Sequence, residues 1–168
     1  MMKKASTTKK PVTRFWPFGL LLFTVLLFLD QYTKNYIITN YALGTSHKIA
    51  PGLWFTYVQN TGTLWGLFRG AGANAAFIWL SVIAFGLLIF FFDQFKTTIE
   101  KIAYTLLLAG LWGNLLDRGV HGFVIDFIDL GWWPVFNIAD SCILVGIALF
   151  TLHQLTHNFK KPTKLRAS

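Results

Sequence analysis

Four long runs of mainly apolar residues, separated by polar segments, dominate the chain. They cover about residues 15–36, 75–92, 99–118 and 137–156. A helix needs about 20 predominantly apolar residues to cross the hydrocarbon core of a bilayer. The pattern therefore predicts an all-α polytopic membrane protein with four transmembrane helices, which are connected outside the bilayer by segments of about 37–74 and 119–136.

The uninterrupted apolar part of the third run, residues 102–116, is short. As a helix it would be about 22 Å long, which is less than the roughly 30 Å of a hydrocarbon core. The helix must therefore extend beyond both ends of this run. That extension brings Asn114, Asp117 and Arg118 to the membrane boundary.

The first long connection has a different pattern. Residues 53–58 are rich in aromatic and β-branched side chains, which is typical of a strand. The next four residues, 59–62, read Gln-Asn-Thr-Gly and predict a turn. We therefore expect a small extracytoplasmic β-containing platform beside the helices.

Composition agrees with a membrane protein. Of the 168 residues, 54% are hydrophobic and only 13% are charged, whereas a soluble domain has about 25% charged residues. Mean hydropathy is +0.51. The chain therefore divides into one membrane domain, about 15–157, between the tails 1–14 and 158–168.

The distribution of charge predicts the orientation. The net charge is +8, and most Lys and Arg residues lie in the two tails and in the 93–101 loop. Basic residues favour the cytoplasmic side of a membrane, so both termini are predicted to be cytoplasmic and the segments 37–74 and 119–136 periplasmic. The tails adjoin lipid-length apolar runs, which favours contact with anionic membrane lipids over nucleic acid.

Acidic residues are concentrated on the predicted periplasmic side. Asp93 and Glu100 lie in the short cytoplasmic loop, where a solvated role is sufficient. The other five of the seven acids lie at the outer helix ends or in the second long connection: Asp30, Asp117, Asp126, Asp129 and Asp140. A carboxylate at the centre of a membrane helix costs about 2.5–3.5 kcal/mol on insertion scales, and less near the interface. The cluster therefore indicates a functional site, with solvation and ion pairing at the outer surface as the alternative.

Asp126 and Asp140 are the least easily explained of these acids. Asp126 stands between apolar residues in a segment that we expect to be extended along the bundle surface, and Asp140 begins an apolar run three residues after Asn137. The alternative for Asn137 and Asp140 is a helix N-cap with a favourable first-turn acid. Two carboxyl groups in a partly dry site share a proton, so that one can act as a base and the other as an acid.

Other polar residues could support such a site. Asn114, Asp117 and Arg118 are spaced for a polar network, which could equally be structural. Asp30 and Lys34 are four residues apart and could simply pair at the interface.

Asn60 and Gly62 fall in the predicted turn, where turn chemistry alone would explain them. His121 could tune the outer site, although a surface histidine is the simpler interpretation.

No metal or other cofactor is expected. His153 and His157 have the spacing of a metal-binding helix face, but a third ligand is missing nearby. Cys142 is the only cysteine, so an internal disulfide and a thiolate metal cluster are both ruled out. The sequence lacks both a Gly-x-Ser-x-Gly motif and a phosphate-binding loop.

Five short motifs, in this order, resemble those of the lipoprotein signal peptidase (signal peptidase II) family. They are Asp30-Gln-Tyr-Thr-Lys34, Asn60-Thr-Gly62, Gly113-Asn114-Leu-Leu-Asp117-Arg118, Gly122-Phe-Val-Ile-Asp126-Phe and Phe136-Asn137-Ile-Ala139-Asp140. Each motif is weak alone, and together they span most of the chain after the basic tail.

The resemblance implies an aspartyl endopeptidase of the bacterial inner membrane. Such an enzyme cuts the signal peptide from prolipoproteins just before a cysteine that carries diacylglycerol, and it is inhibited by the cyclic peptide globomycin. By motif position, Asp126 and Asp140 would be the catalytic pair. The substrate-binding and supporting residues would be Asp30, Lys34, Asn60, Gly62, Asn114, Asp117, Arg118 and Asn137.

The chain departs from the family pattern at two places. Thr63-Leu64-Trp65 replaces Ala-Ala-Phe after the turn, and Ala109-Gly110-Leu111 replaces Gly-Gly-Ala. Both changes place bulkier residues near the site or its packing, so they bear on substrate preference and inhibitor affinity and not on the chemistry. Two alternatives remain from other functional classes, a proton-coupled transporter subunit and a non-catalytic lipid-binding scaffold.

Overall fold

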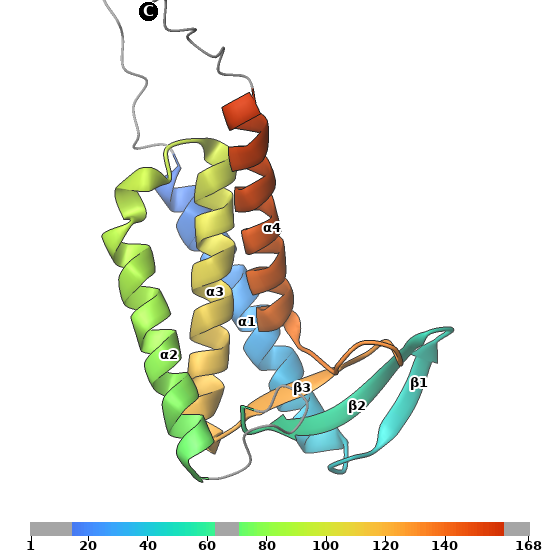
Figure 1. Cartoon of the computed structure of the whole chain (residues 1–168). Coiled ribbons are helices and arrows are strands. Elements are labelled where there is room, and N and C mark those ends of the chain that lie inside the picture. The colour runs from blue at the N-terminus through green and yellow to red at the C-terminus, as the bar shows by residue number, and fades with distance from the viewer. Residues whose placement is uncertain (1–14, 63–70, 160–168) are drawn as a thin grey trace, which may run out of the picture.

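Four antiparallel helices and a three-stranded sheet form the protein in the computed structural model, which describes residues 15–62 and 71–159 (Figure 1). The helices are α1 (Trp16–Asn40), α2 (Ala71–Phe90), α3 (Thr98–His121) and α4 (Ile138–Phe159), with a short 3-10 helix η2 (Phe92–Gln94) between α2 and α3. The strands are β1 (Ser46–Ala50), β2 (Leu53–Asn60) and β3 (Val124–Asp129). The predicted architecture, mainly helical with a small β platform, is confirmed at this level.

The helix boundaries follow local signals. Pro17 lies in the first turn of α1, where its missing N–H costs nothing. Thr97 and Glu100 form a capping box at the start of α3, and Gly122 ends that helix with φ +80°. As the short apolar run required, α3 extends beyond that run at both ends. Compared with the predicted spans, α1 continues four residues further and α2 begins four residues earlier.

The sheet lies at one end of the helical bundle (Figure 1). Its strands are antiparallel in the order β1-β2-β3. Tyr57 from β2 and Ile125 and Phe127 from β3 pack with Ile37 of α1 in a buried apolar cluster. This cluster attaches the sheet to the end of α1, and it buries β3, which the sequence pattern had placed on the bundle surface.

Close approach of α3 and α4 depends on residues without side chains. A Cβ on Gly110 would collide with the carbonyl oxygen of Ala139, and one on Gly146 would lie 3.0 Å from the carbonyl oxygen of Ala103. A Cβ on Gly113 would lie 2.5 Å from the Asp30 carboxylate. These glycines allow α1 and α4 to pack directly on α3.

The outside of the bundle is strongly apolar. Large hydrophobic side chains that are exposed include Leu20, Leu21 and Phe28 on α1, Trp79, Ile83 and Phe90 on α2, and Leu144, Ile147 and Leu152 on α4. Within the described residues, one segment, Ile138–His157, is long and apolar enough to cross a bilayer by length and composition. A shorter apolar helix covers Asn74–Phe90.

Some predictions concern residues outside the described ones. These are the basic tail 1–14, nearly all of the tail 158–168, and the departure at Thr63-Leu64-Trp65.

Candidate active site

Asp126 is buried in the middle of β3, with 2% of its surface exposed. It lies opposite Val58 of β2 in the sheet register. Asn60, at the end of β2, donates from Nδ2 to Asp126 Oδ2 at 2.9 Å. Asn137 donates from Nδ2 to the other carboxyl oxygen at 2.7 Å. Strand pairing thus brings the turn residue Asn60 to Asp126.

Asn60 also holds the turn that follows. Its Oδ1 accepts a hydrogen bond from the backbone N–H of Gly62 at 2.9 Å, and Gly62 has φ +104°. This left-handed conformation favours glycine. The turn chemistry and the contact with Asp126 are therefore combined in one side chain.

Asp140 lies in the first turn of α4. Asn137 precedes the helix, and its Oδ1 accepts a hydrogen bond from the Asp140 N–H at 2.8 Å. Asn137 is therefore the N-cap of α4, which was the alternative interpretation of this residue from the sequence. Asp140 Oδ1 in turn accepts from Asn114 Nδ2 at 2.7 Å. The carboxyl group therefore has a partner on α3 as well as its place at the helix start.

Two asparagines link the two carboxyl groups. Asn137 Nδ2 donates to Asn114 Oδ1 at 3.1 Å as well as to Asp126, and Asn114 donates to Asp140. Each amide thus presents its N–H groups to a carboxyl group and its oxygen to a donor. Asp126 and Asp140, fourteen residues apart in sequence, share one hydrogen-bonded unit.

Both aspartates line one pocket of about 290 Å³. Its other lining residues include Asn60, Gly62, Phe77 and Arg118. The Arg118 guanidinium lies 5.3 Å from the Phe77 ring centre, and its Nε is buried without a hydrogen-bond partner among the described residues. The pocket therefore combines two carboxyl groups with one cation.

The electrostatics of the pocket favour a retained proton. Burial raises the pKa of the Asp126 carboxyl group to about 7, and the nearby Asp140 carboxyl group adds to the rise. The hydrogen bonds from Asn60 and Asn137 and the charge of Lys34 oppose this rise in pKa. Near neutral pH one proton is therefore readily exchanged at the pair.

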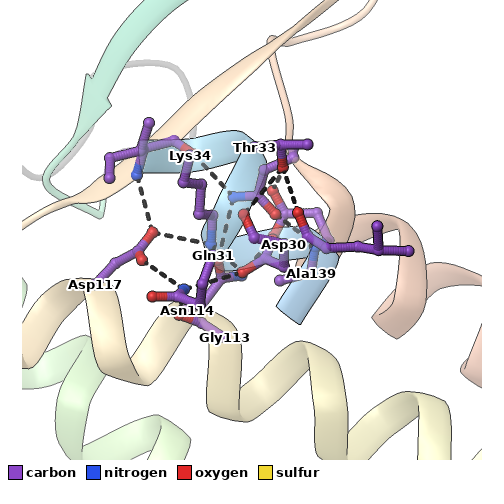
Figure 2. A network of polar contacts seen from close by, with 12 residues as sticks. Asp30, Gln31, Thr33, Lys34, Gly113, Asn114, Asp117 and Ala139 are labelled. Carbon is purple, nitrogen blue, oxygen red and sulfur yellow. Dashed lines mark hydrogen bonds and ion pairs between the residues drawn. The ribbon is translucent and has the colours of Figure 1, made fainter. Parts of the chain in front are cut away.

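A buried ion cluster contacts Asn114 and so supports the pair Asp126 and Asp140 (Figure 2). Lys34 Nζ lies 2.8 Å from Asp30 Oδ2 and 2.9 Å from Asp117 Oδ2, and it donates to Asn114 Oδ1 at 3.1 Å. An ammonium group has three donors, so all three are used. Because Lys34 holds the oxygen of Asn114, the amide N–H group of Asn114 faces Asp140.

The carboxylates of this cluster also join separate elements. Asp30 Oδ1 accepts from the backbone N–H of Ala139 at 2.8 Å, which attaches α1 to the start of α4. Asp117 Oδ2 accepts from the backbone N–H of Ile125 at 3.1 Å, which attaches α3 to β3. Asp30 and Asp117 thus position the chain segments that carry Asp140 and Asp126.

Gln31 is a supporting residue that sequence reasoning did not single out. Its Nε2 lies within hydrogen-bond distance of Asp30 Oδ2, the Gly113 carbonyl oxygen and Asp117 Oδ1, at 3.1, 3.2 and 3.0 Å (Figure 2). The available signal was its polarity, directly after Asp30 and within an apolar helix.

Asp30 and Lys34 do pair, as the simpler alternative held, but the pair is buried inside the protein. Each residue is about 1% exposed, and the pair contacts α3 and α4. The expectation that Glu100 is solvated is wrong. Glu100 is 6% exposed and not solvated. It accepts from the backbone N–H of Thr97 at 2.8 Å and from Gln154 of α4 at 2.9 Å.

The histidines show no metal-site geometry. His153 Nε2 lies 3.8 Å from the Glu100 carboxylate and 3.2 Å from the Thr97 hydroxyl group. Among the described residues, no group of three His, Cys, Asp or Glu side chains is arranged to hold a metal. His121 is exposed and stacks on Phe123 at 5.8 Å.

Two carboxyl groups in one pocket, one of them with a raised pKa, are the groups that an aspartic-type peptidase uses. Comparison with known proteins indicates the same class of enzyme. The family model for signal peptidase (SPase) II matches residues 22–156. The chain therefore belongs to the signal peptidase II family of aspartic-type peptidases.

Individual relatives are similar over most of their length. A lipoprotein signal peptidase of Thermodesulfovibrio yellowstonii is 40% identical over 78% of this chain and 90% of its own. One from Fusobacterium nucleatum is 38% identical over 85% and 89%. A bacterial membrane enzyme solved in meso at 2.3 Å superposes with TM-score 0.80, at 31% identity, over 90% of this chain and 96% of the other.

Proposed function

We propose that this peptidase removes the signal peptide from diacylglyceryl-modified prolipoproteins, cutting just before the lipidated cysteine, with Asp126 and Asp140 as its catalytic pair. The observation that carries the proposal is the position of these two carboxyl groups on one pocket, joined through Asn137 and Asn114. The names of the relatives, lipoprotein signal peptidases, support the class of substrate.

The pair supplies both functions that hydrolysis of a peptide bond needs. The ionised carboxylate removes a proton from a water molecule, which attacks the scissile carbonyl carbon. The protonated carboxyl group then donates its proton to the leaving amine. A pKa of about 7 at Asp126 keeps one proton available near neutral pH. The pair titrates as a unit, so acid and base are roles of the pair.

The remaining pocket residues have supporting roles in this proposal. Arg118 lines the same pocket and carries a positive charge, which suits binding of a carbonyl oxygen or of the glyceryl ester of the substrate. Asn60 and Gly62 also line the pocket. We expect globomycin-type inhibitors to occupy this pocket and to compete with substrate.

We further propose that α1 to α4 all cross the bacterial inner membrane, with both termini in the cytoplasm and the pocket at the periplasmic face. The apolar exterior of α1, α2 and α4 supports four crossings. The sheet, whose strand β3 carries Asp126, lies at the end of the bundle away from the start of α1 and the end of α4 (Figure 1). Asp140 is in the first turn of α4, at the end of that helix nearer the sheet. The basic residues of both tails favour cytoplasmic termini.

The test uses the full-length protein in detergent with a diacylglyceryl prolipoprotein, and it measures release of the signal peptide. Asp126→Asn and Asp140→Asn should each reduce the rate at least about a hundredfold, because either change removes half of the acid–base pair. Asp129→Asn is the matched control. Asp129 is on the same strand but bonds Thr56 and the Gly131 N–H, outside the pocket. Full cleavage by either pair variant would contradict the mechanism, and absence of cleavage by the unaltered protein would favour the non-catalytic scaffold.

A further inference from the structure

A second pocket, of about 480 Å³, lies beside Asp140 on the outer side of α4. Its walls are the connection between β3 and α4 and the first turns of α4. The lining residues are Leu130, Trp132, Trp133, Phe136, Asp140, Ser141, Leu144 and Val145. Below, this pocket is called the α4 groove.

The α4 groove adjoins the candidate active site. Trp133, Phe136 and Asp140 line both cavities. From Asp140 the groove follows α4 toward its middle, past Leu144 and Val145, which are about one turn further along the helix. A group attached to a substrate in the active-site pocket can therefore continue into the groove without leaving the protein surface.

The chemistry of the groove selects its occupant. Besides the indole N–H groups of Trp132 and Trp133, its polar side chains are Asp140, which is engaged by Asn114, and Ser141, whose hydroxyl group donates to the Asn137 carbonyl oxygen at 3.0 Å. A peptide chain in this groove would bring more N–H and C=O groups than these few side chains can pair. A hydrocarbon chain has no such groups.

We propose that the α4 groove binds one fatty acyl chain of the lipid carried by the substrate's cysteine. This inference rests on the proposed function. A bilayer is as apolar as the groove, so transfer out of water is not the driving force. The groove acts by orientation, because an acyl chain that lies along α4 fixes the position of the cysteine, and hence of the scissile bond, relative to Asp140.

The experiment fills the groove. Leu144→Trp places a larger side chain at a residue that is 62% exposed, and Val145→Trp does the same from the next position. Leu152→Trp is the matched control, since Leu152 is 61% exposed on the same helix but outside the groove. The substrates are one prolipoprotein peptide with either two palmitoyl or two butyryl chains on the glyceryl group of its cysteine.

We expect both groove variants to lower kcat/KM for the palmitoyl substrate relative to the butyryl substrate by about tenfold. The tryptophan side chain would occupy the groove, so that the long acyl chain could no longer bind there and orient the scissile bond. Leu152→Trp should leave that ratio at the value of the original protein. Thermal unfolding in the same detergent verifies that the variants are folded.

Other results would overturn the inference. An unchanged ratio in both groove variants would mean that the long chain lies elsewhere. A second contrary result would be that adding phospholipid to the detergent micelles changes the cleavage rate, while the chain length of the substrate does not. The groove would then hold membrane lipid and not the acyl chain of the substrate. Failure of the unaltered protein to cleave either substrate would refute the proposed function itself, which is a different result from a lost preference.

Discussion

The hydrogen bond from Asn60 to Asp126 should set the alkaline limit of activity. Asn60 Nδ2 donates to the carboxylate at 2.9 Å, which stabilises the ionised form and lowers a pKa that burial has raised to about 7. Asn60→Ala removes this donor, so the pKa should rise further. The carboxyl group then keeps its proton to higher pH, and the fall in activity on the alkaline side should move upward.

The size of this change follows from the type of bond. A hydrogen bond to a charged group contributes about 1.5–3 kcal/mol, and a change of one pH unit in a pKa corresponds to about 1.4 kcal/mol. The alkaline midpoint should therefore move from about pH 7 to about pH 8 or 9. The assay is the dependence of kcat/KM on pH, which reports ionisations of the free enzyme.

Two further variants separate this effect from others. Asn60→Asp keeps the oxygen that accepts from Gly62 N–H but places a second carboxylate beside Asp126, so it should also move the midpoint upward. Gln59→Ala is the matched control, because Gln59 donates to the Tyr57 hydroxyl group and not to Asp126. The reasoning is refuted if Asn60→Ala leaves the midpoint in place, or if Asn60→Asp leaves it in place while Asn60→Ala moves it, since the turn would then be the cause.

Three other predictions concern stability, measured by reversible unfolding in mixed micelles. Lys34→Met leaves two buried carboxylates without their cation and should cost about 3–5 kcal/mol; adding Asp117→Asn should recover part of the loss, and additive losses would contradict the pairing. Gln31→Leu should cost about 1–3 kcal/mol, because the Gly113 carbonyl oxygen and the Asp117 carboxylate lose a donor, and a neutral effect would be inconsistent with the network. Gly110→Ala should cost about 1–3 kcal/mol by forcing α3 from α4, whereas Gly86→Ala, with open space at its Cβ, should be neutral or stabilising.

Much of the fold could be read from local patterns. The apolar runs predicted four helices in nearly the observed places, and the aromatic and β-branched residues at 53–58 predicted β2. These features depend on neighbours within a few residues, which is the range over which helix and strand periodicity acts. The helix ends were less predictable, since contacts with the sheet extend α1 to Asn40.

The sequence by itself determined which residues could do chemistry. Acids in an apolar chain are few, so Asp126 and Asp140 were candidates from composition and spacing, and the order of motifs pointed to an aspartyl peptidase. It also determined the asymmetry of basic charge. What it left open was the environment of each charge, because burial depends on the faces that distant segments present to one another.

The tertiary structure decided that environment. Packing of α1 against α3, permitted by the missing side chain of Gly113, turns Asp30 and Lys34 from a surface pair into a buried cluster with Asp117. Packing of α3 against α4 buries Glu100 beside Gln154 in the same way. The cluster then holds the amides that join Asp126 to Asp140. The physical reason is that hydrogen bonds and ion pairs between elements far apart in sequence require the elements to meet, whereas periodicity and composition do not.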